Sequence, residues 1–246
     1  MNENELLNEK LKVYRSFGPV LPEARKGLED SNLWMLLYTV LCQRGVRVKK
    51  QILVDILSGR IMEDVNIDLY GFCFRLRDVY KDMISSVEMQ ATLNTKMLDG
   101  WYMDLLEPDG PVHRRDNAVV YDIGFIPCHY SEIDQKMDRL LKAMDGVSDG
   151  ALKAAELQMG VINIYAYGQD SVTMALLASA YALLQAGIPL PSYPVNEDEY
   201  RRLMSSCIND GDEEPFCSMH YRSLINRLET VISVYREAQE APESQS

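Results

Sequence analysis

The chain has 246 residues, enough for one large domain or for one domain with a small extension. Hydrophobic residues make up 47% and charged residues 25%, so a sizeable core is expected and disorder of the whole chain is not. The formal net charge of −12 disfavours nucleic acid as a partner, because phosphate binding needs clustered Lys and Arg. The densest basic stretch, from Arg44 to Lys50, is interpreted as a solvated turn.

The cysteines predict a reducing, cytoplasmic environment. They are five, an odd number without the spacing of a disulfide framework, and the first ten residues are too polar and acidic for a secretory signal. One grouping, Cys207, Cys217 and His220, is zinc-like but lacks a fourth ligand at a suitable spacing. Scattered thiols are therefore expected, and no metal site.

The first half of the chain carries helical patterns. The segment 2–17 is amphipathic, with Leu6, Leu7 and Leu11 on one stripe, and Ser31 is expected to cap a second helix. Further helices are expected in this half at residues 49–57, about 64–86 and 93–106.

The periodicity changes once, in the segment AVVYDIGFI at residues 118–126. Its β-branched and aromatic residues with one Gly predict a short strand or hairpin. After Pro127 the helical pattern resumes, because Ile133, Met137 and Leu141 lie on one amphipathic face. The remaining helices are expected at residues 149–164, about 169–186, 197–207 and about 215–237, before an acidic, frayed tail at 240–246.

The expected fold class is all-α with one short β-hairpin. An N-terminal helical extension is expected at residues 1–32, followed by one helical domain at 33–239. The segment 171–196 has no charged residue, but its strongly apolar part, 174–184, is shorter than the roughly 20 residues that a membrane span needs. The sequence therefore predicts a buried central helix, and no membrane as a partner.

The segment 154–191, AAELQMGVINIYAYGQDSVTMALLASAYALLQAGIPLP, resembles the core of Fic domains. In that family a helix leads into the loop His-Pro-Phe-x-(Asp/Glu)-Gly-Asn-Gly-Arg-x-x-Arg, and a buried Leu-rich helix follows and ends in Gly-x-Pro. The framework matches without a gap. Residues 117–141 resemble the family's β-hairpin flap and the helix after it, and residues 40–57 resemble its N-terminal inhibitory segment.

The resemblance implies a helical protein whose family uses ATP and Mg²⁺ to transfer AMP to protein hydroxyls. The loop His would act as general base, and the acidic residue would hold Mg²⁺. The Gly-Asn-Gly amides would cradle phosphates at a helix N-terminus. The two arginines would neutralise phosphate charge, and the second would also meet an inhibitory Glu.

The loop of this chain departs from that motif at nearly every functional position. Tyr165 stands at the His position, and a phenol with a pKa of about 10 is a poor base near neutrality. Tyr167 keeps an aromatic ring, and Gln169 replaces the metal-binding carboxylate. The other replacements are Ala166 for Pro, Asp170, Ser171 and Val172 for Gly-Asn-Gly, and Thr173 and Leu176 for the two arginines.

The inhibitory Glu position is Gln43, so both halves of the family's inhibitory ion pair are absent together. This coordinated loss predicts a catalytically inactive Fic-like protein without ATP or Mg²⁺ as cofactor. Its expected role is to bind or regulate another protein. The alternative is a divergent nucleotide-binding transferase with altered active-site chemistry. A third possibility is a structural role as a homo-oligomer through the N-terminal helices.

Simpler interpretations of the same residues stay open. Residues 154–191 would form a buried helical pair if the resemblance were accidental. Asp170 would cap a helix, and Tyr165 and Tyr167 would be packing residues. The flap residues Val119, Val120 and Tyr121 would be either hairpin core or an exposed edge that takes a target peptide as an added strand.

Overall fold

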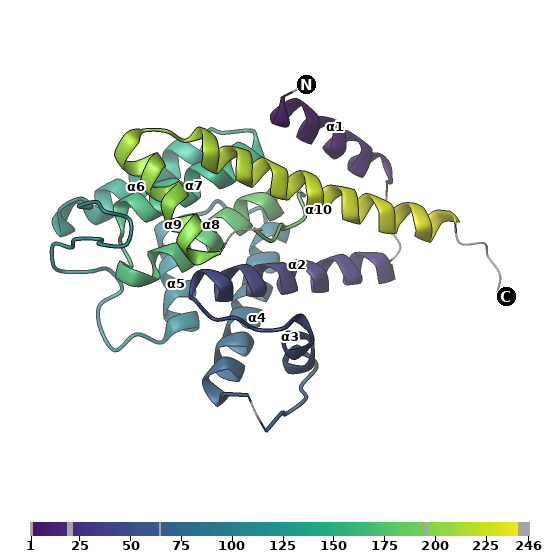
Figure 1. Cartoon of the computed structure of the whole chain (residues 1–246), viewed down its shortest axis with the longest axis horizontal. Coiled ribbons are helices and arrows are strands. Elements are labelled where there is room, and N and C mark those ends of the chain that lie inside the picture. The colour runs from purple at the N-terminus through teal and green to yellow at the C-terminus, as the bar shows by residue number, and fades with distance from the viewer. Residues whose placement is uncertain (1, 19–21, 64, 194–195, 241–246) are drawn as a thin grey trace.

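The computed structural model describes residues 2–18, 22–63, 65–193 and 196–240, and nearly all of its regular structure is helical (Figure 1). The helices of the first half are α1 (Glu3–Ser16), α2 (Pro22–Gln43), α3 (Lys50–Leu57), α4 (Ile67–Glu88) and α5 (Thr95–Leu106). Those of the second half are α6 (Ile133–Asp145), α7 (Gly150–Ile164), α8 (Ser171–Gln185), α9 (Glu197–Ser205) and α10 (Glu214–Glu240). The expected all-α fold class is confirmed for the part of the chain that is described.

Helix α8 lies at the centre of the fold and packs most extensively on α7. Nearly every side chain from Ser171 to Leu183 is buried, as expected for a central helix that carries no charge. No helix within the described ranges is long and apolar enough to cross a membrane.

The close contact between α7 and α8 depends on a glycine. A Cβ atom added at Gly150, the first residue of α7, would lie 2.2 Å from the Cβ of Ala186, which follows α8. Asp149 caps α7 by accepting hydrogen bonds from the backbone N–H groups of Ala151 (2.9 Å) and Leu152 (3.1 Å). The start of α7 is therefore fixed both by its cap and by a contact that admits no side chain.

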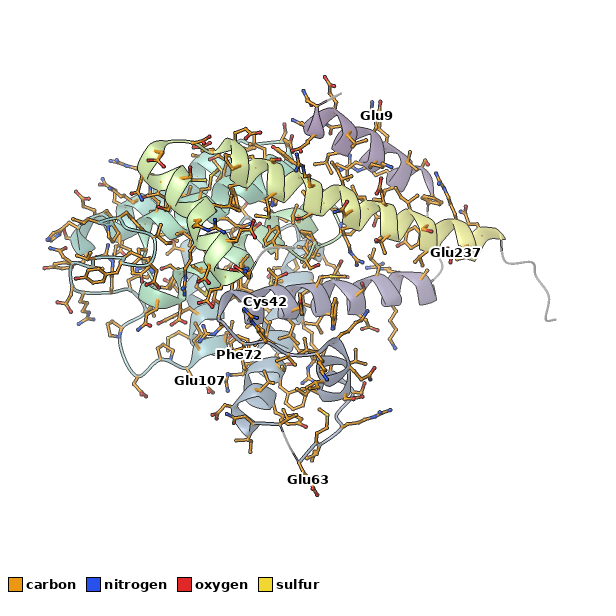
Figure 2. The ribbon with its side chains drawn as sticks, in the orientation of Figure 1. Glu9, Cys42, Glu63, Phe72, Glu107 and Glu237 are labelled. Atoms are coloured by element: carbon orange, nitrogen blue, oxygen red, sulfur yellow. The ribbon has the colours of Figure 1, made fainter. Side chains whose placement is uncertain are left out.

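Helix α1 packs along α10, and the two lie side by side at the edge of the molecule (Figure 1). A capping box begins α1, because Asn2 and Glu5 exchange backbone-to-side-chain hydrogen bonds of 2.8 and 3.0 Å. Leu7 and Leu11 are buried, whereas Glu9 lies on the outer side of α1 (Figure 2).

Helix α2 begins earlier than predicted, at Pro22 instead of after Ser31. Residues 22–30 are mostly charged and lack the apolar periodicity that marks the rest of the helix, so the pattern alone did not reveal them. The expected boundary between residues 32 and 33 lies inside α2, where Asn32 is buried and accepts a hydrogen bond from the N–H of Leu190 (3.0 Å). Of the predicted tail at 240–246, residues 241–246 lie outside the described residues.

The predicted hairpin at residues 118–126 contains a single antiparallel bridge, between Val120 and Phe125. The N–H of Val120 donates to the carbonyl of Phe125 (3.0 Å), and the N–H of Phe125 donates to the carbonyl of Val120 (3.2 Å). The segment is a tight turn closed by one residue pair, shorter than the strand that its β-branched residues suggested. We call residues 118–126 the flap.

Candidate functional site

The loop between α7 and α8 begins at Tyr165, a non-glycine residue with left-handed backbone (φ 57°). Arg114 holds this turn: its Nε donates to the carbonyl of Tyr165 (3.0 Å), and its backbone N–H donates to the carbonyl of Ala166 (2.9 Å). Its Nη2 also donates to the carbonyl of Cys128. Arg114 thus connects the loop to Cys128, which follows the flap, by donating hydrogen bonds to backbone carbonyl oxygens.

Tyr167 is buried inside the fold and is not among the residues that line the cleft beside the loop. Its hydroxyl donates to Oδ1 of Asp99 (2.8 Å), and its ring lies 5.0 Å from that of Tyr102. The same Asp99 oxygen contacts Nε2 of His113 (3.0 Å), whose Nδ1 contacts Oδ1 of Asp134 (3.0 Å). Burial lowers the pKa of His113, but the hydrogen bonds and charges of Asp99 and Asp134 outweigh it and raise that pKa.

A cleft of about 240 Å³ lies beside the loop. Its walls come from the end of α2, the flap, the loop, the start of α8 and α9. They combine three carboxylates, two arginines, two tyrosines, two amides, three apolar side chains and one threonine. The described lining residues are Gln43, Arg44, Val120, Asp122, Ile123, Tyr165, Gln169, Asp170, Val172, Thr173, Glu197, Tyr200 and Arg201.

Arg44 crosses this cleft. Its Nη1 donates to Oδ1 of Asp170 (2.6 Å) and to Oγ1 of Thr173 (3.2 Å), and its guanidinium lies 5.3 Å from the centre of the Phe72 ring. Phe72 is on α4, near the end of α2 that carries Cys42 (Figure 2). Residues 44–50 form a largely exposed turn, as expected, and Arg44 within it also joins α2, α4 and the start of α8.

Asp170 does not act as the predicted side-chain cap. It occupies the N-cap position of α8 but makes no capping hydrogen bond, because its carboxylate is turned to Arg44. The hydroxyl of Ser171 accepts a bond from the N–H of Tyr167 (3.2 Å) instead. A negative charge consequently lies at the helix end where an anion would bind.

A second arginine braces the other side of the cleft. Nη2 of Arg201 forms an ion pair with Oε1 of Glu197 on its own helix and lies 3.5 Å from Oδ2 of Asp122 in the flap. Glu197 packs on the backbone of Gly45 (φ 74°). A Cβ atom added at Gly45 would lie 2.8 Å from Oε2 of Glu197. Sequence reasoning missed Arg44, Asp122, Glu197 and Arg201, because only the tertiary fold brings these separate segments together.

Tyr165 is half-buried in the cleft wall, with its ring edge-on to Phe125 at 6.2 Å. Burial raises the pKa of its phenol, and the charges of Asp122 and Asp170 raise it further, against the opposing effect of Arg114 and Arg201. The phenol therefore stays protonated at neutral pH.

By the resemblance, Gln43 on α2 and Leu176 on α8 occupy the positions of the inhibitory Glu and its arginine partner. Both side chains are buried. Gln43 ends α2 and lines the cleft, whereas Leu176 belongs to the core of α8. Gln169 is exposed at the rim. Most of the predicted loop positions therefore line the cleft, whereas Tyr167 and Leu176 lie in the core.

The flap divides the three predicted peptide-binding residues. Val120 is buried over the cleft, whereas Val119 and Tyr121 are 51% and 85% exposed. The carbonyl of Ile123 accepts hydrogen bonds from Oγ of Ser205 (2.8 Å) and Nδ2 of Asn209 (3.0 Å), which fixes the flap tip to α9 and the π-helix Ser206–Asp210. Val120, Ile123 and Phe125 are the buried residues of the flap, and most of its other residues face solvent.

A buried hydrogen-bond chain lies behind Tyr200. The Tyr200 hydroxyl donates to Oε1 of Gln158 (2.8 Å), and Nε2 of Gln158 donates to the hydroxyl of Tyr193. The Tyr193 hydroxyl lies 2.9 Å from Nδ1 of His220, and Nε2 of His220 lies 3.1 Å from the carbonyl of Ala151. A carbonyl only accepts, so Nε2 carries the proton of His220 and Nδ1 accepts from Tyr193.

The zinc-like grouping of the sequence does not meet as a ligand set. Both ring nitrogens of His220 are engaged in this chain, and Cys207 and Cys217 are free thiols whose pKa values burial raises to about 12 and about 11. Within the described ranges, no group of three or more His, Cys, Asp or Glu side chains is placed to hold a metal ion.

No protein-family model and no curated protein matches this chain. Solved structures do. A Fic domain containing signalling protein from Bacteroides thetaiotaomicron matches with a TM-score of 0.82 at 16% identity, over 94% of this chain and 98% of that one. Fic-1 from C. elegans matches with a TM-score of 0.72 at 12% identity, over 96% of this chain and 73% of that one.

A Fic family protein from Desulfovibrio desulfuricans also matches, with a TM-score of 0.72 at 13% identity, over 98% of this chain and 75% of that one. The chain therefore has the fold of Fic domain proteins over nearly its whole length. The fold predicted from the resemblance of residues 154–191 is confirmed, and the buried helical pair is part of it.

Proposed function

We propose that this chain is a catalytically inactive Fic-like protein that binds or regulates another protein. The observation that carries the proposal is the Arg44–Asp170 ion pair (2.6 Å) across the cleft. In the resemblance, backbone amides at this loop hold phosphate. Here the Asp170 carboxylate lies at that position and neutralises the guanidinium of Arg44. A nucleotide would have to break this ion pair and would be repelled by Asp170.

The chemistry of the loop supports the same proposal. A general base must accept a proton near neutral pH, and the raised pKa of Tyr165 moves its phenol further from that range. Gln169 offers a neutral amide oxygen where Mg²⁺ prefers a carboxylate. We accordingly expect neither ATP nor Mg²⁺ as cofactor.

The flap supports a protein partner. Val119, Tyr121 and Ile126 are exposed apolar side chains within eight residues of chain, at the outer side of a turn whose tip is fixed. An extended peptide that pairs with the outer backbone of residues 119–121 would cover these side chains. The partner is expected to supply such a segment.

Melting temperature with ATP, GTP or CDP-type nucleotides, each with and without Mg²⁺, tests the inactive cleft. We expect no shift for the wild-type protein. The variant Asp170→Asn removes the repelling charge and leaves Arg44 free to bind phosphate. A nucleotide is therefore expected to raise the melting temperature of this variant more than that of the wild type. A clear wild-type shift would contradict the proposal and favour the alternative, a divergent nucleotide-binding transferase, which the open volume of the cleft supports.

Two variants, each replacing a large exposed side chain with serine, test the partner surface. Tyr121→Ser changes the flap, and Ile61→Ser changes an apolar residue of similar exposure in the connection between α3 and α4. Partners recovered from the source cells are expected to be lost with the flap variant and retained with the control. Equal recovery with both variants would count against the flap as the binding surface.

A further inference from the structure

Arg227 is buried where α1, α2 and α10 meet. It belongs to α10, and only 7% of its surface is exposed. Figure 1 shows α10 between α1 and α2. Nη2 of Arg227 donates to Oγ of Ser31 (2.7 Å) and lies 3.4 Å from Oδ1 of Asn32. Both acceptors are neutral, so they satisfy a donor without balancing the charge.

No carboxylate of the described residues forms an ion pair with Arg227. The groups whose charge acts on its pKa are the hydroxyls of Tyr14, Tyr235 and Tyr80, and burial, the largest effect, lowers that pKa. An arginine stays protonated even so. Burying a cation without an anion beside it is unfavourable, because the ion loses its hydration and gains no compensating charge.

One donor of Arg227 is also without an acceptor. Its Nε is buried and has no hydrogen-bond partner. Arg114, the other well-packed arginine without a carboxylate, is different, because its Nε and both terminal nitrogens donate to carbonyl oxygens. Buried polar groups are nearly always paired, so the unpaired Nε marks a position where an acceptor is expected.

We propose that the junction of α1, α2 and α10 binds one small oxyanion, a carboxylate or a phosphate, at Arg227. An oxyanion supplies both missing features, a negative charge for the guanidinium and an acceptor for Nε. The hydroxyl of Tyr235 is also buried without a hydrogen-bond partner, and its charge acts on the same guanidinium, so it is a further donor for the ligand. The ligand is small because so little of Arg227 is exposed.

The site links the anion to the attachment of α1. The ring of Tyr235 stacks on that of Tyr14 (6.0 Å between centroids) and meets that of Phe17 edge-on (5.7 Å). Both partners belong to α1 or to the residue after it. An anion held between Arg227 and these phenols therefore stabilises the contact between α1 and α10.

Melting curves at constant ionic strength test the proposal, with chloride replaced stepwise by phosphate or by acetate. We expect a saturable rise of the wild-type midpoint with one of the two, reaching roughly 5–10 °C at a hundredfold excess over its Kd. Which anion acts distinguishes a phosphate site from a carboxylate site. Equilibrium dialysis with labelled phosphate or acetate is expected to give one ion per chain.

Arg227→Met is expected to abolish the saturable rise, and Arg227→Lys, which keeps the charge but lacks Nε, to weaken it. The matched control is Arg222→Met, on the same helix but exposed and paired with Glu3, which is expected to respond like wild type. Dialysis of the wild-type protein decides the matter even where Arg227→Met does not fold. The proposal is overturned by a wild-type stoichiometry of zero, or by an equal response of wild type and a folded Arg227 variant.

Discussion

Asp170 and Arg44 show how single residues change the character of a cleft. By the resemblance, Gln43 and Leu176 stand at the positions that an inhibitory Glu and its arginine partner hold in Fic domains. The neighbouring positions nevertheless join the same two segments with an ion pair of opposite polarity, the cation on the α2 side and the anion on the loop. An ion pair therefore joins the end of α2 to the loop.

A double-mutant cycle measures this connection. We expect Arg44→Met and Asp170→Asn to be coupled by about 1 kcal/mol in the free energy of unfolding, because the pair is about two-thirds buried and shares a bond with Thr173. Urea denaturation of the wild type, both single variants and the double variant gives the value. Strictly additive effects would mean that the pair contributes nothing to stability.

Tyr167 gives a second prediction at this scale. Tyr167→Phe removes a buried hydroxyl from Asp99 and is expected to lower the free energy of unfolding by about 2 kcal/mol, the value typical of a hydrogen bond to a charged group. Tyr121→Phe is the control, since its hydroxyl is on an exposed side chain, and should change stability by less than about 0.5 kcal/mol. Chemical denaturation of the two variants side by side checks this, and equal effects would refute it.

At the scale of elements, the helices could be predicted because their apolar periodicity is local. The predicted ends of α1, α3, α5 and α7 lie within about two residues of the observed ones. The start of α2 was missed because residues 22–30 are helical without an apolar stripe. Nothing local reports that Arg44 meets Asp170, 126 positions away, so the cleft positions were predicted but their pairing was not.

Two glycines in helices predict opposite effects of the same substitution. A Cβ at Gly100 in α5 meets nothing within 4 Å, so Gly100→Ala is expected to stabilise the fold by about 0.5–1 kcal/mol through helix propensity. At Gly150 the Cβ would lie 2.2 Å from that of Ala186, so Gly150→Ala is expected to destabilise by about 1–3 kcal/mol. Thermal and urea unfolding of both variants test the sign, and a stabilising Gly150→Ala would show that α7 and α8 are not in close contact.

The hydrogen-bond chain that ends at His220 joins α7, α9 and α10, and protonation of His220 is expected to weaken their contacts. Burial lowers its pKa to about 4 from an ordinary value of 6.5, against the raising effects of the Ala151 carbonyl and Asp149. The unfolded chain therefore binds a proton more readily between pH 6.5 and 4, so stability is complete above pH 6.5 and falls by up to about 3 kcal/mol as the pH drops towards 4. The proton would occupy Nδ1, the acceptor for Tyr193.

The pH dependence of unfolding in wild type and His220→Gln isolates this contribution. Between pH 6.5 and 4.5 the wild type is expected to lose more stability than the variant, because the other titrating groups, including His113 with its raised pKa, are common to both. Parallel curves would show that His220 does not titrate in this range on unfolding.

At the scale of the whole molecule, two kinds of contact attach α1 to the rest. It buries Leu7 and Leu11, and its polar residues reach α10 through the pairs Lys10–Glu229 (2.6 Å) and Arg222–Glu3. Exposed ion pairs contribute about 0–1 kcal/mol each, so the apolar contacts are expected to dominate. A helix attached mainly along one neighbour is free to open without the core.

Leu7→Ala tests whether α1 is such a unit. Leu7 is fully buried, so its truncation is expected to cost about 2–3 kcal/mol in the attachment of α1 and to speed amide hydrogen exchange in Glu3–Ser16 by about 30-fold or more. Exchange in α8 is expected to change little, because α8 packs mainly on α7, with α2, α4 and α5 as further neighbours, and α1 is not among its main neighbours. Val13→Ala, at a more exposed position of α1, serves as control and should leave both unchanged. If the amides of α8 accelerate as much as those of α1, the N-terminal helix and the Fic-like core unfold as one cooperative unit, and occupancy of the Arg227 junction would then stabilise the entire fold instead of α1 alone.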